Sequence, residues 1–262
     1  TPACPGGPSG ECMGARAPMA SGGWVEANTG GAGCTGDGGA TTTGRGGGGG
    51  GRSGGGGRVD YGALQYFTEY WPSDNTDAME RIFIQWEYSY FYPAIATCNH
   101  VTDWSKLPLK FRTDVAMMGK MGYDIVVGQL SENDLQFSKQ AVATYKSISD
   151  LVWHGDLYRL VNPRENPVAS LMFANELQSR AVVFTYYTGN RFMLTATPQP
   201  IQLKGLDAKK NYSVKEINVY PGAHSTINSS QVYSGDFLMK VGINPDVNAW
   251  RSSVILEVNE VQ

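Results

Sequence analysis

Residues 64–91, LQYFTEYWPSDNTDAMERIFIQWEYSYF, contain the transition that decides the fold. Residues 64–70 are rich in aromatic side chains, which is typical of a β-strand, and the breaker Trp71-Pro72-Ser73 ends this run. Beyond it the apolar residues recur at helical spacing, at Met79, Ile82, Phe83, Trp86 and Tyr90. Asp77, followed by Glu80 three positions later, resembles a capping box with Asp in place of Ser or Thr. The segment therefore predicts one β/α unit: a strand, a loop and a helix.

The same pattern continues to about residue 155 and then changes. Residues 92–97 and 115–121 predict two further strands, and residues 131–152 predict a long helix capped at Ser131. Beyond residue 155, short strand-like runs are separated by turn residues, which favours an antiparallel sandwich or barrel. These runs are residues 169–174, 181–187, 192–196, 212–219, 237–241 and 253–258. The chain is therefore expected to hold the end of an array of β/α units, followed by a small all-β domain.

Residues 1–51 have a different composition from the rest of the chain. Residues 1–57 hold 23 of the 33 glycines, and residues 1–60 contain no Leu, Ile, Phe or Lys. Such a stretch buries too little apolar surface to offset the entropy of ordering it, so we expect a disordered arm. Cys, Met and Trp scattered among the glycines also fit a wrong-frame translation of GC-rich coding sequence. Both interpretations stay open.

Charge and residue spacing exclude several classes of function. The formal net charge of −3 argues against a general nucleic-acid or membrane-surface role. No apolar run approaches the roughly 18 residues that a membrane span needs. The histidines, His100, His154 and His224, lack the spacing of metal ligands, so we expect neither a metal nor another cofactor. The sequence predicts no particular compartment.

Polar groups follow each of the three strands predicted before residue 125. They are Ser73-Asp74, His100 with Asp103, and residues 122–124. Barrels built from β/α units place their catalytic groups where strands end, so these residues are candidates. Helix N-capping is the alternative for Asp74, Asn75 and Asp77, and a structural hydrogen bond is the alternative for His100. Spacing alone favours the alternatives.

Residues 53–81, SGGGGRVDYGALQYFTEYWPSDNTDAMER, resemble the α-galactosidases of glycoside hydrolase family thirty-six. In that family a C-S-G-G-G-G-R segment follows one barrel strand, and S-D-[DN]-T-D-A-x-E-R follows the next. The resemblance continues through residues 97–104, 111–125 and 154–160, and it covers about residues 53–262. It implies the C-terminal part of a (β/α)8 barrel over residues 52–155 and an antiparallel β-sandwich domain over residues 156–262.

The resemblance also implies a chemistry. Enzymes of this family are retaining: one carboxylate attacks the anomeric carbon, and a second protonates the leaving oxygen and then activates water. Asp74 matches the family's acid/base. The implied partner is an α-galactoside oligosaccharide, and the implied substrate-binding residues are Ser53, Gly54, Gly55, Trp71, Asn75 and His100. Trp71 has core packing as its alternative. Family members are often oligomeric, so a homo-oligomer of the full-length protein is one expectation.

Two departures from the family pattern limit what the chain can do alone. Arg52 stands where the family has a Cys that lies against the galactose, so Arg52 would crowd the pocket. The family's nucleophile belongs to a K-W-D-x-N motif, which does not occur in this chain. We therefore expect a C-terminal fragment that is inactive alone. A related galactosyltransferase, an α-N-acetylgalactosaminidase, and a non-catalytic carbohydrate-binding or structural remnant are the alternatives to an α-galactosidase.

Overall fold

The computed structural model describes residues 72, 73, 75, 77–189 and 200–261, and the backbone of two dipeptides near the N-terminus. Those dipeptides, β1 (Ala17–Pro18) and β2 (Trp24–Val25), pair with each other in antiparallel fashion. The strand predicted at residues 64–70 lies outside the described residues, as does the rest of the arm over residues 1–51.

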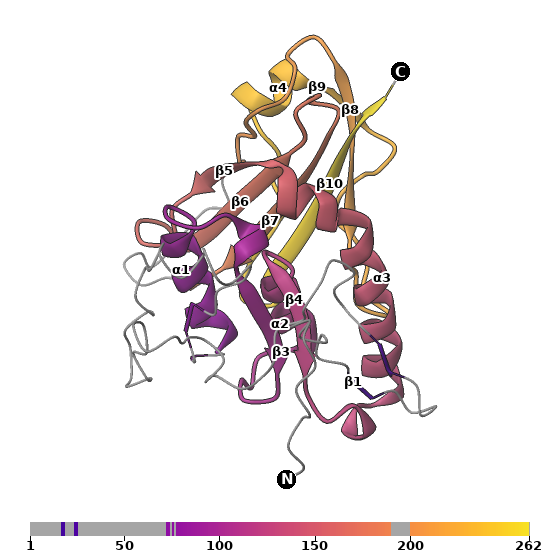
Figure 1. The fold of residues 1–262 in the computed structure, drawn as a ribbon. Coiled ribbons are helices and arrows are strands. Elements are labelled where there is room, and N and C mark those ends of the chain that lie inside the picture. The colour runs from indigo at the N-terminus through magenta and orange to yellow at the C-terminus, as the bar shows by residue number, and fades with distance from the viewer. Residues whose placement is uncertain are drawn as a thin grey trace, which may run out of the picture.

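The first described part of the chain alternates helices with two parallel strands (Figure 1). Its elements are α1 (Ala78–Tyr88), η3 (Ala94–Ala96), β3 (Cys98–Thr102), α2 (Leu109–Ala116), β4 (Lys120–Asp124), η4 (Val127–Gln129) and α3 (Glu132–His154). The helices predicted after Asp77 and after Ser131 are confirmed, and both residues cap their helices with side-chain oxygens. The side chains at 3.6-residue spacing explain why: α1 and α3 each bury one face.

The two strands predicted at residues 92–97 and 115–121 are wrong in position. Pro93 precedes a 3₁₀ turn at Ala94–Ala96, so the strand starts only at Cys98. The apolar run at 115–121 begins inside α2, where Val115 and Ala116 are buried, and the strand starts at Lys120. Short apolar runs do not distinguish a buried helix from a buried strand. Residues 122–124 consequently lie inside β4 rather than in a turn after it.

The second part is a six-stranded sheet in which every pair of neighbours is antiparallel. The strands are β5 (Asp156–Val161), β6 (Val168–Ala174), β7 (Arg180–Tyr187), β8 (Asn211–Ile217), β9 (Val232–Ser234) and β10 (Ser253–Val261), in the order β5-β6-β7-β10-β8-β9. Four of the predicted runs are confirmed as β6, β7, β8 and β10. The run at 237–241 is wrong, because Ser234 caps a helix there, α4 (Gly235–Lys240). The run at 192–196 lies outside the described residues.

Side chains alternate along each strand, and an apolar cluster covers each face of this sheet. Leu171 and Phe173 of β6 join the cluster formed with α1, α2 and α3. Met172 and Ala174 point the other way, into a cluster that includes Leu238 of α4. The predicted architecture, a partial barrel-like α/β segment followed by an antiparallel β-domain, is confirmed. The division at residues 52–155 and 156–262 stays a prediction.

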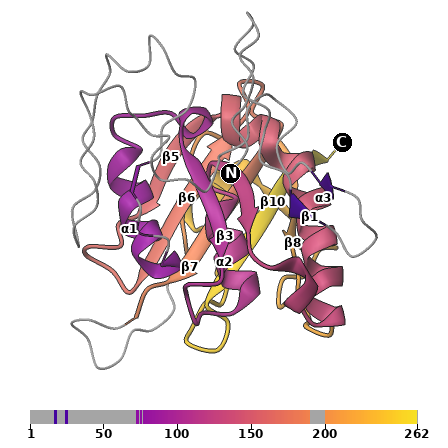
Figure 2. The same cartoon turned by 60° about the horizontal axis from the view of Figure 1, so that its bottom comes forward.

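Helix α2 joins the two parts, and Figures 1 and 2 show it with β3 and β4 against one face of the sheet. Asp114 of α2 is fully buried and accepts hydrogen bonds from Lys110 Nζ at 2.5 Å and from Asn218 Nδ2 at 2.6 Å. Its carbonyl oxygen accepts from the hydroxyl of Tyr186 at 2.8 Å. Lys110 also donates to the carbonyl oxygen of Ser253 at 3.3 Å. This network, which we call the α2 joint, fixes the sheet against the α/β part.

Among the described residues there is neither a membrane-spanning helix nor a cluster of metal-ligating side chains. None of the helices there has the length and apolarity needed to cross a membrane. The described ranges also hold no group of three or more His, Cys, Asp or Glu side chains that could bind a metal ion.

Candidate functional site

The candidate site lies on one face of the β3–β4 pair, toward the carboxyl ends of the strands. The strands are parallel, so both carboxyl ends meet at the same edge, and His100 lies opposite Gly122. Val101 and Met121 pack in the cluster with the helices. Since neighbouring residues of a strand point to opposite faces, His100, Gly122 and Asp124 share the face turned away from that cluster.

His100 is held between a glycine and a carboxylate on this face. Its Nδ1 lies 3.9 Å from Oδ2 of Asp124, and the His100 side chain is 3% exposed against 48% for Asp124. A Cβ at Gly122 would lie 3.3 Å from Cδ2 of His100 and 3.6 Å from its Nε2. Glycine at position 122 therefore leaves the imidazole its space. The pair presents a buried imidazole beside an accessible carboxylate at the strand ends.

Asp103, the other candidate after β3, connects two loops. Its Oδ2 accepts the backbone N–H of Val126 at 3.2 Å, and its Oδ1 lies 3.5 Å from the Arg112 guanidinium. Arg112 also donates to the carbonyl oxygens of Thr102 and, at 2.9 Å, of Leu107. Asp103 thus holds the loops that follow β3 and β4 together, which is a structural use of its carboxylate.

The loop before α1 is organised by short-range hydrogen bonds. The N–H of Asn75 donates to Ser73 Oγ at 3.1 Å, and the N–H of Asp77 donates to Asn75 Oδ1 at 3.0 Å. Asp77 Oδ1 in turn accepts from the N–H groups of Met79 at 2.9 Å and Glu80 at 3.1 Å. Asp77 is therefore a helix cap, but its own N–H is satisfied by Asn75 and not by Glu80, so the capping box is only half formed. These bonds fix the described residues on both sides of position 74.

Arg81 ties this loop to β3. Its guanidinium donates to the carbonyl oxygens of Ser73 at 3.2 Å and Cys98 at 2.8 Å, and to Asn99 Oδ1 at 2.7 Å. Burial lowers the pKa of Arg81 to about 10, opposed by the charge interaction with Tyr88, so the group stays a cation at neutral pH. The sequence reasoning did not single out Arg81. The sequence did contain a clue to this role: Arg81 is the last residue of the SDNTDAMER segment and lies one helical turn after the Asp77 cap.

The structure describes two of the seven predicted site residues. Asn75 is exposed and bonded within its loop, and His100 is buried on the strand face. The predicted acid/base Asp74 lies outside the described residues, as do the predicted substrate-binding residues Ser53, Gly54, Gly55 and Trp71. Arg81 is the connection through which the described loop residues reach β3.

Comparison with known proteins assigns both parts of the chain. A family model described as melibiase matches residues 50–155, and a model described as the glycosyl hydrolase family 36 C-terminal domain matches residues 168–256. The chain belongs to glycoside hydrolase family 36. The family resemblance predicted from residues 53–81 is thereby confirmed.

The relatives of this family 36 chain are α-galactosidases several times its length. α-Galactosidase AgaA of Geobacillus stearothermophilus is 40% identical over 177 residues, which are 63% of this chain and 23% of AgaA. α-Galactosidase 2 of Hypocrea jecorina is 34% identical over 201 residues, which are 73% of this chain and 24% of that protein. The chain thus spans about a quarter of the length of these curated relatives.

Solved structures of α-galactosidases also match most of this chain, over about a quarter of their own length. A variant of AgaA from Geobacillus stearothermophilus in complex with raffinose superposes with a TM-score of 0.67 at 32% identity, covering 78% of this chain and 27% of that one. Another AgaA variant, in complex with stachyose, gives a TM-score of 0.67 at 34% identity and covers 79% of this chain and 28% of that one.

Proposed function

We propose that this chain is part of a retaining α-galactosidase that hydrolyses terminal α-D-galactosyl residues of oligosaccharides, with Asp74 as its acid/base. The observation that carries the proposal is the hydrogen-bonded frame on both sides of position 74. Ser73, Asn75 and Asp77 are linked in series, and Arg81 anchors Ser73 to the strand β3. Such a frame suits a loop that must hold a reacting carboxyl group in one position.

The frame also separates the roles of the acidic residues in this segment. The Asp77 carboxylate accepts two backbone N–H groups of α1, which commits it to capping. Glu80 points out from the exposed side of the first turn of that helix. Asp74 is the remaining carboxyl group of the segment. As acid/base it would protonate the leaving oxygen and then take a proton from the attacking water.

The proposed substrates are α-galactosides of the raffinose type, because relatives of this chain were solved with raffinose and with stachyose. Ser53, Gly54, Gly55, Trp71, Asn75 and His100 are the residues proposed to contact the sugar. Asn75 offers an exposed amide before α1, and His100 offers an imidazole on the strand face. Assembly of the complete enzyme into a homo-oligomer is part of the same proposal.

The retaining mechanism needs a second carboxylate as nucleophile. The family's K-W-D-x-N motif is not among these 262 residues, so the nucleophile must come from outside them. The chain by itself is therefore expected to release no product from an aryl α-galactoside.

A graft into a complete relative tests the role of Asp74. Residues 53–155 of this chain would replace the matching segment of AgaA, and hydrolysis of raffinose and of 4-nitrophenyl α-galactoside would be measured. Asp74→Ala should lower raffinose hydrolysis by about 10²–10⁴-fold, because the leaving oxygen loses its acid. The aryl substrate should lose less, because nitrophenolate departs without protonation. Added azide should restore turnover and yield α-galactosyl azide.

Asp77→Asn is the matched control, since asparagine also caps helices. It should leave both activities close to those of the graft. If Asp74→Ala hydrolysed raffinose at the rate of the unmodified graft, the acid/base role proposed for Asp74 would be contradicted. A substrate carrying an N-acetyl group, and sucrose as a galactosyl acceptor, would identify the two related activities in the same assay.

A further inference from the structure

The buried amide of Gln85 has no hydrogen-bond partner among the described residues. Gln85 lies on α1, the residue is 7% exposed, and neither Oε1 nor Nε2 contacts a donor or acceptor of the described residues. Two N–H groups and a carbonyl oxygen removed from water without replacement are costly to the folded state. Buried polar groups in native proteins are almost always satisfied, by protein or by an ordered water.

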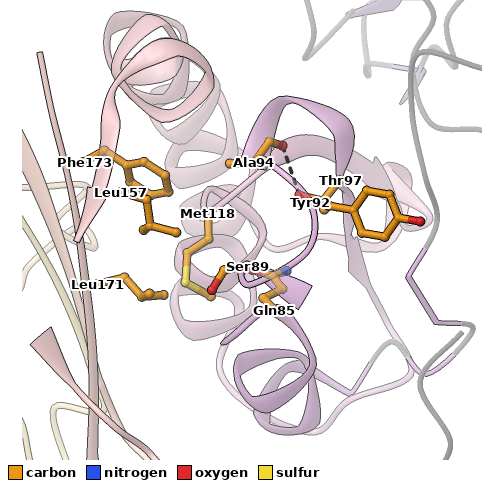
Figure 3. A pocket seen from close by; sticks show the side chains of 9 residues that line it. All are labelled: Gln85, Ser89, Tyr92, Ala94, Thr97, Met118, Leu157, Leu171 and Phe173. Carbon is orange, nitrogen blue, oxygen red and sulfur yellow. Dashed lines mark hydrogen bonds between the residues drawn. The ribbon is translucent and has the colours of Figure 1, made fainter. Parts of the chain in front are cut away.

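The side chain of Gln85 lines a cavity between the α/β part and the sheet. One wall comes from α1, η3 and the end of α2, and the other comes from Leu157 of β5 with Leu171 and Phe173 of β6 (Figure 3). The cavity holds about 20 Å³ of space for the centre of a water-sized molecule. A single water needs about 10–15 Å³ by this measure, so the space suffices for one.

We propose that this cavity holds one ordered water molecule, bound to the Gln85 amide at the seam between the two parts of the chain. A buried water needs two or more polar partners. Besides Gln85, the lining includes the hydroxyls of Thr97 and Ser89. Thr97 Oγ1 donates to the carbonyl oxygen of Ala94 at 3.0 Å and keeps an unused acceptor site. The water can therefore accept from Gln85 Nε2 and donate to Thr97 Oγ1.

The polar groups in its wall distinguish this cavity from an ordinary packing defect. Cavities lined only by aliphatic and aromatic groups stay dry, whereas an amide in the wall supplies both a donor and an acceptor. The second hydroxyl is already fixed across the seam, because Ser89 Oγ donates to the carbonyl oxygen of Trp86 at 2.6 Å and accepts from Arg159 Nε of β5 at 2.8 Å. The water thus lies where α1 meets the sheet, and it belongs to the contact between the two parts.

A crystal structure of the 262-residue chain, paired with solution NMR, tests the proposal. We expect one ordered water within about 2.7–3.2 Å of the Gln85 amide and of a lining hydroxyl. In solution, the Gln85 side-chain NH₂ should show magnetisation transfer from a long-lived water. Gln85→Leu, which keeps the shape and removes both polar atoms, should abolish the water density. Gln85→Met serves the same purpose if the leucine variant folds poorly.

Gln140→Leu is the control, because Gln140 is exposed on the long helix α3 and does not line this cavity. It should leave the water in place. The melting temperature gives a second readout. A dry, unsatisfied amide predicts that Gln85→Leu raises Tm by about 2–4 °C or more, while a hydrated amide predicts a smaller change. Absence of density beside Gln85, or direct protein partners for its amide, would overturn the proposal.

Discussion

The two parts of the chain are stabilised in different ways. In the sheet, strands from distant parts of the sequence pair side by side, and apolar clusters cover both faces. In the described α/β part, β3 and β4 pair only with each other, and a two-stranded unit is marginal by itself. Helix caps, the Arg81 anchor and contacts to the sheet supply the rest. The stability of the α/β part therefore depends on its contacts with the sheet.

A substitution in the α2 joint should uncouple the α/β part from the sheet, and it has the largest expected effect on stability. Asp114→Ala leaves Lys110 and Asn218 without their buried partner, which should cost about 3–5 kcal/mol of the free energy of unfolding. Urea denaturation followed by tryptophan fluorescence measures this loss. Trp86 and Trp153 belong to the α/β part, so its loosening should precede loss of the far-ultraviolet signal of the sheet.

An exposed pair with the same spacing provides the control. Asp236 and Lys240 also stand four residues apart on a helix, with Oδ1 and Nζ 2.6 Å apart, but their side chains are 49% and 73% exposed. Asp236→Ala should cost at most about 0.5 kcal/mol. Equal losses for the two variants would contradict the idea that burial at the joint is decisive.

Glycine substitutions compare the packing of the two parts. A Cβ at Gly235, at the start of α4, would overlap the carbonyl oxygen of Asp207 and lie 3.0 Å from Tyr212 Cε2. Gly235→Ala should therefore destabilise the outer layer of the sheet by about 1–3 kcal/mol. Gly128 of the α/β part has no atom within 4 Å of such a Cβ, and Gly128→Ala should change stability by less than about 0.5 kcal/mol. Thermal denaturation of both variants measures the difference.

Alkaline pH should weaken the joint through Tyr186. Burial, together with the nearby Asp114, raises the pKa of the Tyr186 hydroxyl well above its ordinary value. The unfolded chain therefore loses this proton first as pH rises. The stability it contributes is complete below about pH 10 and declines above it, with a slope of at most about 1.4 kcal/mol per pH unit.

Denaturation of the chain and of Tyr186→Phe between pH 9 and 11 checks this pH dependence. The phenylalanine variant lacks the hydrogen bond to the Asp114 carbonyl oxygen, so it should be less stable at neutral pH. Its stability should fall less steeply above pH 10. Parallel curves for the two proteins would show that Tyr186 does not govern the alkaline loss.

Removal of the α1 cap should have a modest effect, which concerns the α/β part alone. Asp77→Ala leaves the N–H groups of Met79 and Glu80 without their acceptor and should cost about 1 kcal/mol. Hydrogen exchange of the first turn of α1 measures the local opening. Asp77→Asn should restore most of the protection, and failure to do so would assign the effect to charge and not to capping.

Sequence patterns predicted the long elements well and the short ones poorly. Helices α1 and α3 carry a cap and several turns of apolar spacing, so their type and start were readable. β3 and β4 are five residues each, and the apolar runs beside them belong to η3 and α2. β5 and β9 were missed. The charged residues Asp156 and Arg159 interrupt the apolar residues of β5, and β9 has only three residues, so neither shows an uninterrupted apolar run.

The sequence predicted only those residues of the candidate site that belong to a recognisable motif. The SDNTDAMER segment indicated Asp74, Asn75 and the Asp77 cap, and the structure describes the last two. The anchoring of Ser73 by Arg81 depends on a backbone carbonyl of Cys98, a contact that no local pattern encodes. The neighbouring positions of His100 and Asp124 depend on the β3–β4 register, which the misplaced strands could not supply.

The central position of β10 has a consequence for how the chain is made. β10 pairs with β7 on one side and β8 on the other, yet it follows both in the sequence. During synthesis, at about 5–20 residues per second, β7 and β8 leave the ribosome with these edges unpaired until Ser253–Val261 emerges. Unpaired edges recruit strands from other chains. The nascent polypeptide therefore passes through an interval in which it is prone to aggregate, and that interval ends only when β10 emerges.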